Sequence, residues 1–175
     1  HKNKKQIKKM EKNKIENVKN NEDIINNPIL AIVRISGMVK VRKDIEETLD
    51  RLKIRRKYSC VIINKNDKNI YGMLKKVKYY VAYGNIDKEV LRKLIEERAE
   101  NIEGRKSKIK INSEEVAEGL FKNKRLKDFG LKEFFRLHPP RKGIKSKLHY
   151  PKGVLGDNKK DINKLIERML WWEVW

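Results

Sequence analysis

Apolar residues form two kinds of pattern along this chain: short continuous runs and stripes at helical spacing. The run ILAIVRIS at 29–36 is β-branched and apolar up to Arg34, which predicts a buried strand that Gly37 ends. SCVII at 59–63 predicts a second short strand. FFRL at 134–137 predicts a third, which two following prolines terminate.

Stripes at helical spacing lie between and after these runs. In the first of them Val41, Ile45 and Leu49 recur on one helix face. Asp87 and Ser113 are the predicted N-caps of two later helices. The predicted helices, in chain order, cover about 41–52, 70–83 (ended by Gly84 and Asn85), 88–99, a short segment after 113, and 158–170.

The order of these elements predicts an α+β fold. We expect a ferredoxin-like, split β-α-β core with a three-stranded antiparallel sheet and a C-terminal helix. Residues 1–28 are rich in Lys, Asn and Glu, and are predicted to form a basic N-terminal arm. The length of 175 residues then suits one domain at 29–175, with a helical insert at about 87–130 and a basic loop at 138–153.

Charge indicates the kind of partner. The chain has 45 Lys and Arg against 24 Asp and Glu, a formal net charge of +21. Such a charge repels itself in the free protein, so a polyanion, and above all a nucleic acid, is the expected partner. The stretch 134–153 carries six Lys and Arg and no Asp or Glu, with two His, one Tyr and three of the four prolines. Cations neutralise phosphates, rings stack on unpaired bases, and prolines reduce the entropy lost on docking.

Other kinds of chemistry find little support in the residues. The single Cys60 excludes an intrachain disulfide and a Cys-rich zinc site, and it is predicted to be a buried apolar residue. The three His lie at no metal-ligand spacing and beside no nucleophile, and no Gly-rich phosphate loop is present. Acids cluster on helix faces, where solvated surface is the better interpretation than a carboxylate pair. No apolar run is long enough to span a bilayer. We therefore expect no enzyme activity, no catalytic or metal site, no cofactor and no membrane partner.

A set of short segments, taken in order and spacing, resembles the ribosomal protein L-thirty family of the large subunit, in its longer archaeal type. The eukaryotic relatives of that type are called ribosomal protein L-seven. The arm before residue 28 matches eukaryotic extensions only in character, and the tail WWEVW at 171–175 departs from the pattern. We interpret that tail as a cap over the last helix in preference to an RNA or protein contact. The matching segments, covering roughly 29–169, are VRI at 33–35, Thr48, Leu49, Leu52, Ile54, Arg56, Ser59, Val61, Met73, Leu74, Val77, Tyr80, VAYG at 81–84, RLHPPRKG at 136–143 and INKLIERM at 162–169.

The resemblance implies a structural constituent of the large ribosomal subunit, located in the cytoplasm. It implies as partners large-subunit rRNA of the 23S type, near the 5S rRNA, and neighbouring ribosomal proteins. A free-standing RNA chaperone or regulatory RNA-binding protein carries the same charges and remains the alternative. The residues expected to bind RNA are Arg34, Arg42, Arg55, Arg56, Lys57, Tyr71, Lys75, Lys76, Lys78, Arg136, His138, Arg141, Lys142, Lys145, Lys147 and Tyr150.

Overall fold

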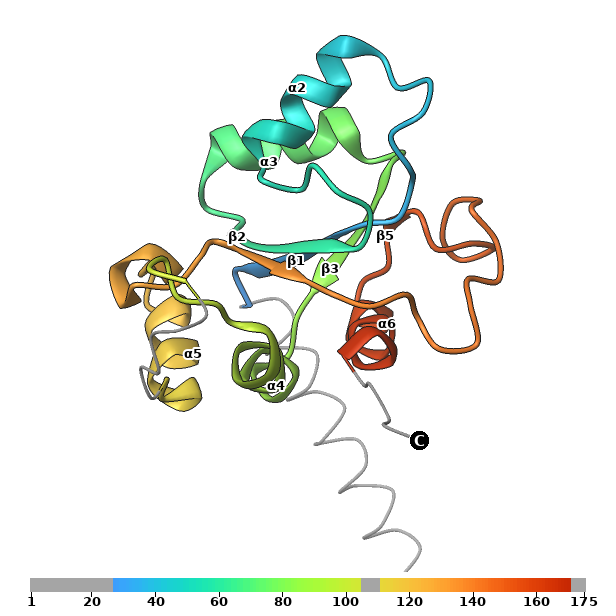
Figure 1. The fold of residues 1–175 in the computed structure, drawn as a ribbon. Helices are drawn as coiled ribbons and strands as arrows, with labels where there is room; N and C mark the ends of the chain where they lie inside the picture. The colour runs from blue at the N-terminus through green and yellow to red at the C-terminus, as the bar shows by residue number, and fades with distance from the viewer. Residues whose placement is uncertain (1–26, 105–110, 171–175) are drawn as a thin grey trace, which may run out of the picture.

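The computed structural model describes residues 27–104 and 111–170, and these contain a five-stranded sheet in the order β4-β2-β1-β3-β5. The central β1 is antiparallel to β2 and β3, β4 is antiparallel to β2, and β5 is parallel to β3 (Figure 1). The strands are β1 (Ile29–Arg34), β2 (Ser59–Asn64), β3 (Val81–Asn85), β4 (Phe134–Arg136) and β5 (Gly156–Asp157). The α+β class is confirmed. The expected sheet of three antiparallel strands is wrong in extent, because a strand joins each side of the antiparallel trio β2-β1-β3 and one of them is parallel.

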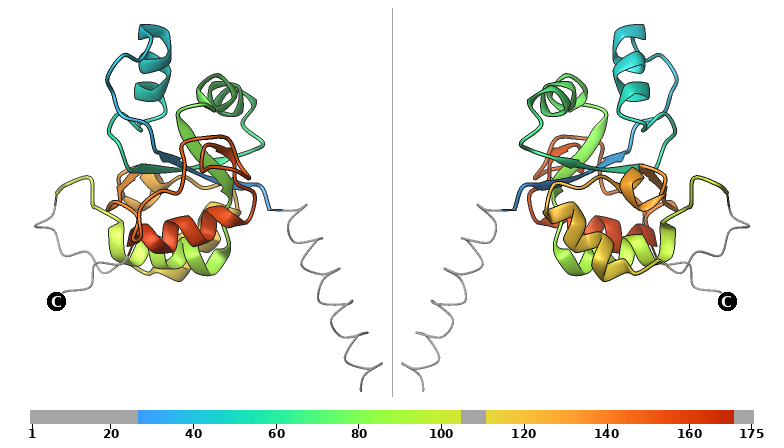
Figure 2. Two further views of the ribbon diagram at one scale, coloured as in Figure 1. Left: turned by 90° about the vertical axis from the view of Figure 1, so that its right-hand side faces the viewer. Right: turned by 90° about the vertical axis from the view of Figure 1, so that its left-hand side faces the viewer.

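Helices cover both faces of the sheet. One layer is formed by α2 (Lys43–Arg51) and α3 (Lys68–Val77), whereas α4 (Lys88–Arg98) and α6 (Asp161–Leu170) pack on the opposite face (Figures 1 and 2). A further helix, α5 (Ser113–Phe121), packs against α4 and is followed by the short 3-10 helix η1 (Leu126–Phe129). The segments β1-α2-β2 and α3-β3 build a split β-α-β layer. The sequence predicts such a layer, but with the segment 134–137 and not β3 as its third strand.

The second predicted helix is too long. It ends at Val77, and the residues that we expected to continue it form β3 beside β1. Val77 and Val81 stand four apart, which suggested one helical stripe, but they belong to different elements. Gly84 does not end a helix but lies in β3, where the backbone packs closely: a Cβ there would lie 2.2 Å from the carbonyl oxygen of Lys159.

The segment expected to be the third strand is the fourth, because β3 precedes it. It pairs with the edge of β2 over Ser59–Val61, and Phe135 is fully buried there while Phe134 is half-buried. Of the two predicted N-caps, Asp87 is confirmed in position and Ser113 is wrong by one residue. Asp87 occupies the N-cap position of α4 without a capping side-chain hydrogen bond, and Asn112 caps α5 in place of Ser113.

A polar residue of α6, Asn163, forms a hydrogen bond with the backbone at the start of α4. Asn163 is 6% exposed, and its Oδ1 accepts the Asp87 N–H at 2.9 Å. Its Nδ2 donates to the carbonyls of Asn85 and Lys160 at 3.2 and 3.0 Å. Buried amides with such partners fix the relative position of the elements they join, here β3, α4 and α6.

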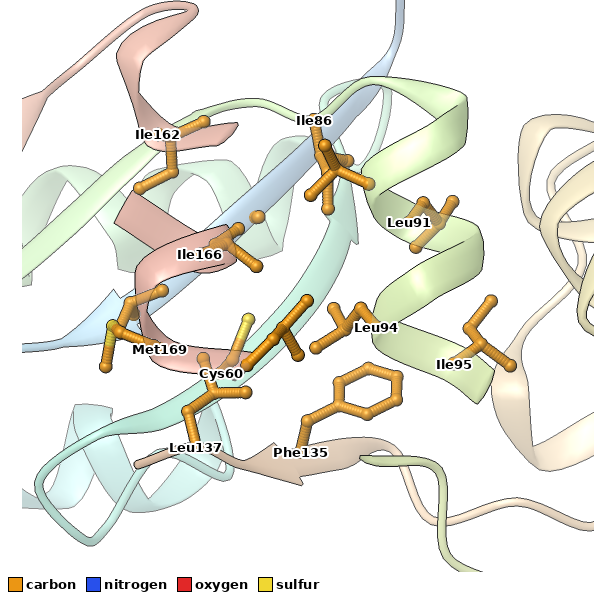
Figure 3. Close-up of a cluster of buried hydrophobic side chains, with 14 of the residues drawn as sticks. Cys60, Ile86, Leu91, Leu94, Ile95, Phe135, Leu137, Ile162, Ile166 and Met169 are labelled. Atoms are coloured by element: carbon orange, nitrogen blue, oxygen red, sulfur yellow. The ribbon is translucent and has the colours of Figure 1, made fainter. Parts of the chain in front are cut away.

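Two apolar clusters lie on the two faces of the sheet. The larger lies between the sheet and α4, α5 and α6, and Figure 3 shows Phe135 of β4 with Leu94 and Ile95 of α4 and Ile166 of α6. The smaller is covered by α2 and α3 and includes Leu49. Alternate residues of β1 contribute to the two clusters, as a strand buried on both faces requires.

Cys60 is fully buried in the larger cluster, and burial raises the pKa of its thiol to about 12. Because the thiolate is the reactive form, we expect iodoacetamide at pH 8 to alkylate the native protein about 100-fold more slowly than the protein in urea. Mass spectrometry over time measures both rates. Equal rates in the two conditions would contradict the burial of this side chain.

Candidate nucleic-acid interface

The sheet topology brings the cationic segments to one end of the molecule. β1 and β4 finish at this end, and β2, β3 and β5 begin there, as the antiparallel and parallel pairings require. The connections that meet there are 35–42, 52–58, 78–80 and 137–155, and we call them together the cationic end. Most of the predicted RNA-binding residues lie in these connections or on the elements next to them.

Arg34 is at the centre of this end but does not face solvent. It is 1% exposed, and its guanidinium donates to the carbonyls of Ile54 at 3.1 Å and Arg55 at 2.5 Å. It also donates to the carbonyls of Ser36 and Gly37, each at 3.2 Å. The predicted RNA contact at Arg34 is therefore corrected: its donors hold the connections 35–42 and 52–58 together.

The connection 52–58 presents Arg55, Arg56 and Lys57 to solvent. Arg55 lies 3.9 Å from Asp50, an exposed pair that gives little net energy, and Lys57 stands over the Tyr58 ring at 4.9 Å. Arg136 lies next to this turn because it pairs with Ser59, and its side chain is exposed. These four cations form one contiguous part of the cationic end.

The residues expected on the second helix are less uniform than predicted. Lys75, Lys76 and Lys78 are exposed at the end of α3, but Lys76 lies 3.8 Å from Asp44, whose carboxylate also receives Arg42 at 2.9 Å. Tyr71 is half-buried against the smaller cluster. Lys75 stands over its ring at 5.0 Å, so this ring is not an open stacking surface.

The connection 137–155 is held at several points. Arg168 of α6 donates through Nε and Nη2 to the Arg141 carbonyl at 3.0 and 2.8 Å, and Nη2 also donates to the Gly143 carbonyl. Farther along, the Tyr150 hydroxyl donates to Asp161 at 2.6 Å, and this bond raises the pKa of Tyr150. The backbone of Gly153 fits so closely that a Cβ there would lie 2.1 Å from the Leu148 carbonyl oxygen.

The same connection reaches the end of α3. The His149 ring contacts the exposed Tyr79 ring edge-on, with the centroids 4.9 Å apart. The Lys78 ammonium stands over the same Tyr79 ring, 5.2 Å from its centroid. The ring contact joins the turn after α3, with Lys78, to the connection 137–155.

The lysines and arginines of the predicted site in this connection are exposed, whereas its histidine His138 is half-buried. Arg141, Lys142, Lys145 and Lys147 are all exposed. His138 differs, because burial and the nearby Arg98 lower the pKa of its imidazole. It is therefore neutral near pH 7 and adds no positive charge there.

Two residues of the candidate interface, Tyr79 and Arg168, are absent from the predicted set of RNA-binding residues. Tyr79 was placed inside a helix that in fact ends two residues earlier, and only the correct boundary exposes it as a turn residue. Arg168 was part of an apolar helix pattern, and nothing local shows that it reaches carbonyls 25 and 27 residues away.

Within residues 27–104 and 111–170, no group of three or more His, Cys, Asp or Glu is arranged to hold a metal ion. None of the helices described there is long and apolar enough to cross a membrane. Most of the predicted N-terminal arm, part of the basic segment after α4 and the tail WWEVW lie outside the described residues.

The fold and the cationic end define a class: a basic α+β protein with split β-α-β topology whose cations gather at one end of the sheet. Comparison with known proteins makes this specific. A family model described as ribosomal protein L30p/L7e matches residues 30–81. The chain also resembles curated archaeal proteins over nearly their whole length, as the following relatives show.

The large ribosomal subunit protein uL30 of Archaeoglobus fulgidus is 41% identical, over 81% of this chain and 99% of the relative. The uL30 proteins of Nanoarchaeum equitans and Methanococcus vannielii are each 39% identical, over 81% and 80% of this chain and 99% and 98% of the relatives. The chain belongs to the ribosomal protein L30p/L7e family, which confirms the resemblance inferred from its motifs.

Proposed function

We propose that this protein is a structural constituent of the large ribosomal subunit and binds large-subunit rRNA through the cationic end. The observation that carries the proposal is the convergence of four separate basic connections at one end of the sheet. Family membership supports the same role, since the relatives are named large ribosomal subunit proteins. The protein then resides in the cytoplasm as part of the ribosome and carries out no catalysis.

Phosphate binding is the chemistry that these residues suit. Exposed Lys and Arg exchange the counterions of the RNA backbone, and this needs no base-specific contact. The clamp from Arg168 and the bond from Tyr150 restrict the connection 137–155 before RNA arrives, so less entropy is lost on binding. The exposed Tyr79 adds a ring on which an unpaired base stacks.

The proposed RNA-binding residues are those of the sequence prediction without Arg34, and with Tyr79 added. Tyr71, Tyr150 and His138 act through their positions in the fold more than through their own charge. The basic residues 1–28 are proposed to add further phosphate contacts, on the evidence of their charge alone. Placement beside the 23S-type rRNA near the 5S rRNA, and contact with neighbouring ribosomal proteins, are parts of the same proposal.

Replacing Arg141, Lys142 and Lys145 together with alanine tests the proposal. We expect weaker binding to a large-subunit rRNA fragment and a flatter salt dependence. Each lost phosphate contact lowers the slope of log K against log [salt] by about 0.9 on the duplex scale. Filter binding between 50 and 300 mM KCl measures that slope.

The matched control is the triple alanine variant of Lys68, Lys122 and Lys127, which removes the same charge from exposed positions away from the cationic end. The control keeps most of the slope if the proposal is correct. Equal slopes in the two variants would show that net charge alone, and not the cationic end, controls binding.

The alternative of a free-standing RNA chaperone predicts a different distribution in the cell. After a high-salt wash and a sucrose gradient, a subunit constituent stays with the large subunit in stoichiometric amount. Recovery in the top fractions would instead favour the regulatory or chaperone role. Quantitative mass spectrometry of the fractions decides between them.

A further inference from the structure

A groove of about 530 Å³ opens at the end of the sheet away from the cationic end. Its lining comes from the end of α2, the far half of β2, the start of α3 and the segment around η1. In Figure 1 these elements lie on the left, and the connection 137–155 lies on the right. None of the residues that line the groove belongs to the connections 35–42, 78–80 or 137–155. Leu52 and Lys53 begin the connection 52–58, so the groove borders the cationic end at that one connection.

The groove contains an open sheet edge. β4 pairs only with Ser59–Val61, and the next residues of β2, 62–64, pair with β1 alone among the described strands. Lys65 donates to Pro28 on the β1 side, whereas Tyr58 accepts the Leu137 N–H on the β4 side. Backbone groups alternate along a strand, so the Ile62 carbonyl and the Asn64 N–H point into the groove.

The walls of the groove suit an extended peptide. Ile62 and Leu126 lie on the α4 side of the sheet, while Ile63 and Met73 lie on the α3 side. A strand that continued the line of β4 would place alternate side chains against these two walls. This is the arrangement by which a peptide adds to a sheet edge: main-chain bonds supply affinity, and side-chain pockets supply specificity.

The positive charge at the rim of the groove favours an acidic peptide. The lining holds four cations, Arg51, Lys53, Lys124 and Arg125, and two carboxylates, Asp67 and Glu133. Both carboxylates are engaged, since Asp67 caps α3 and Glu133 pairs with Lys53. Asp128 accepts the backbone N–H of Arg125 at 3.0 Å, but within the part of the chain that the structure describes no carboxylate forms an ion pair with the guanidinium of Arg51 or Arg125, which are exposed at the rim.

We propose that this groove binds an extended segment of another protein that alternates apolar and acidic residues and adds a short strand beside β2. The basic arm of this chain is a poor occupant, because its charge matches that of the rim. The site goes beyond rRNA binding and gives the protein a second face, directed at a protein neighbour.

A fluorescein-labelled, capped seven-residue peptide of alternating valine and glutamate tests the proposal by fluorescence anisotropy with the full chain. Because the whole protein is basic, the decisive comparison is between two charge-matched variants. Arg51→Glu with Arg125→Glu changes the groove, and Lys145→Glu with Lys147→Glu changes the cationic end. We expect the groove pair to weaken peptide binding about tenfold or more, and the second pair to weaken it much less.

Two further probes separate strand addition from charge attraction. A peptide with proline at its central position keeps most of the charge but cannot pair fully with the edge, so it should bind more weakly. A valine–lysine peptide should not bind. Equal weakening by the two variant pairs, or equal binding of the proline peptide, overturns the proposal.

The rRNA fragment used for the alanine variants distinguishes this inference from the proposed function. The groove pair should leave rRNA binding nearly intact, whereas the pair in the cationic end should reduce it. If the groove pair weakens rRNA binding as strongly as peptide binding, the groove belongs to the RNA surface and the peptide assignment is wrong. Circular dichroism confirms that each variant is folded.

Discussion

Replacing Phe135 with alanine lowers the free energy of unfolding by about 3–5 kcal/mol. The ring is fully buried in the larger cluster, where Figure 3 places it against Leu94 of α4. The cost combines the lost transfer energy of the ring with that of the cavity it leaves. Urea unfolding followed by circular dichroism measures the change.

Phe134 provides the internal control, because it has the same side chain on the opposite face of the same strand. It is half-buried, and Arg136 stands over its ring at 5.7 Å. Phe134→Ala should therefore cost clearly less than Phe135→Ala. Equal losses would contradict the difference in burial between the two rings. A larger loss for Phe134→Ala would mean that the register of β4 against β2 is shifted by one residue, since such a shift exchanges the two faces.

Replacing Arg34 with methionine should cost about 3–5 kcal/mol. The substitution keeps a long apolar stem but leaves four carbonyls, in the connections 35–42 and 52–58, without their charged donor. Each unsatisfied buried group costs about 1–3 kcal/mol, and part of this is recovered by water at the more open carbonyls. The connection that carries Arg55 loses its anchor, so rRNA binding should weaken as well.

Two variants separate the geometry of Arg34 from its charge. Arg34→Lys keeps the charge but not the planar fork of donors, and it should recover only part of the stability. Arg42→Ala removes an exposed arginine whose partner is the exposed Asp44, and it should change stability by at most about 1 kcal/mol. Full rescue by lysine would show that charge, and not the set of hydrogen bonds, is what matters at position 34.

Sequence periodicity was sufficient for the elements that have one clear pattern. The strand at 29–34 and the helices α2 and α4 follow directly from continuous apolar residues and from regular stripes. The prediction failed at β3, because Val81, Ala82 and Gly84 are all buried and so show no alternation of apolar and polar residues. The two-residue β5 has too little sequence to give any signal.

The candidate site was predictable in composition but not in arrangement. The absence of acids from 134–153 is by itself enough to indicate the basic connection. The sequence could not separate Arg34 from Arg42, because burial depends on carbonyls that come from 54 and 55. It also could not join Tyr79 to His149, which are 70 residues apart in the chain and meet only through the order of the strands.

The clamp between Arg168 and the carbonyls of Arg141 and Gly143 also determines when the protein becomes competent during its own synthesis. The basic connection is made before its anchor, which lies near the end of the last helix. A nascent chain that lacks α6 carries all of these cations without the geometry that orders them. The clamped form of the connection 137–155 therefore requires α6 to have been made and docked on the sheet, so this part of the interface becomes ordered later than the connections that precede it.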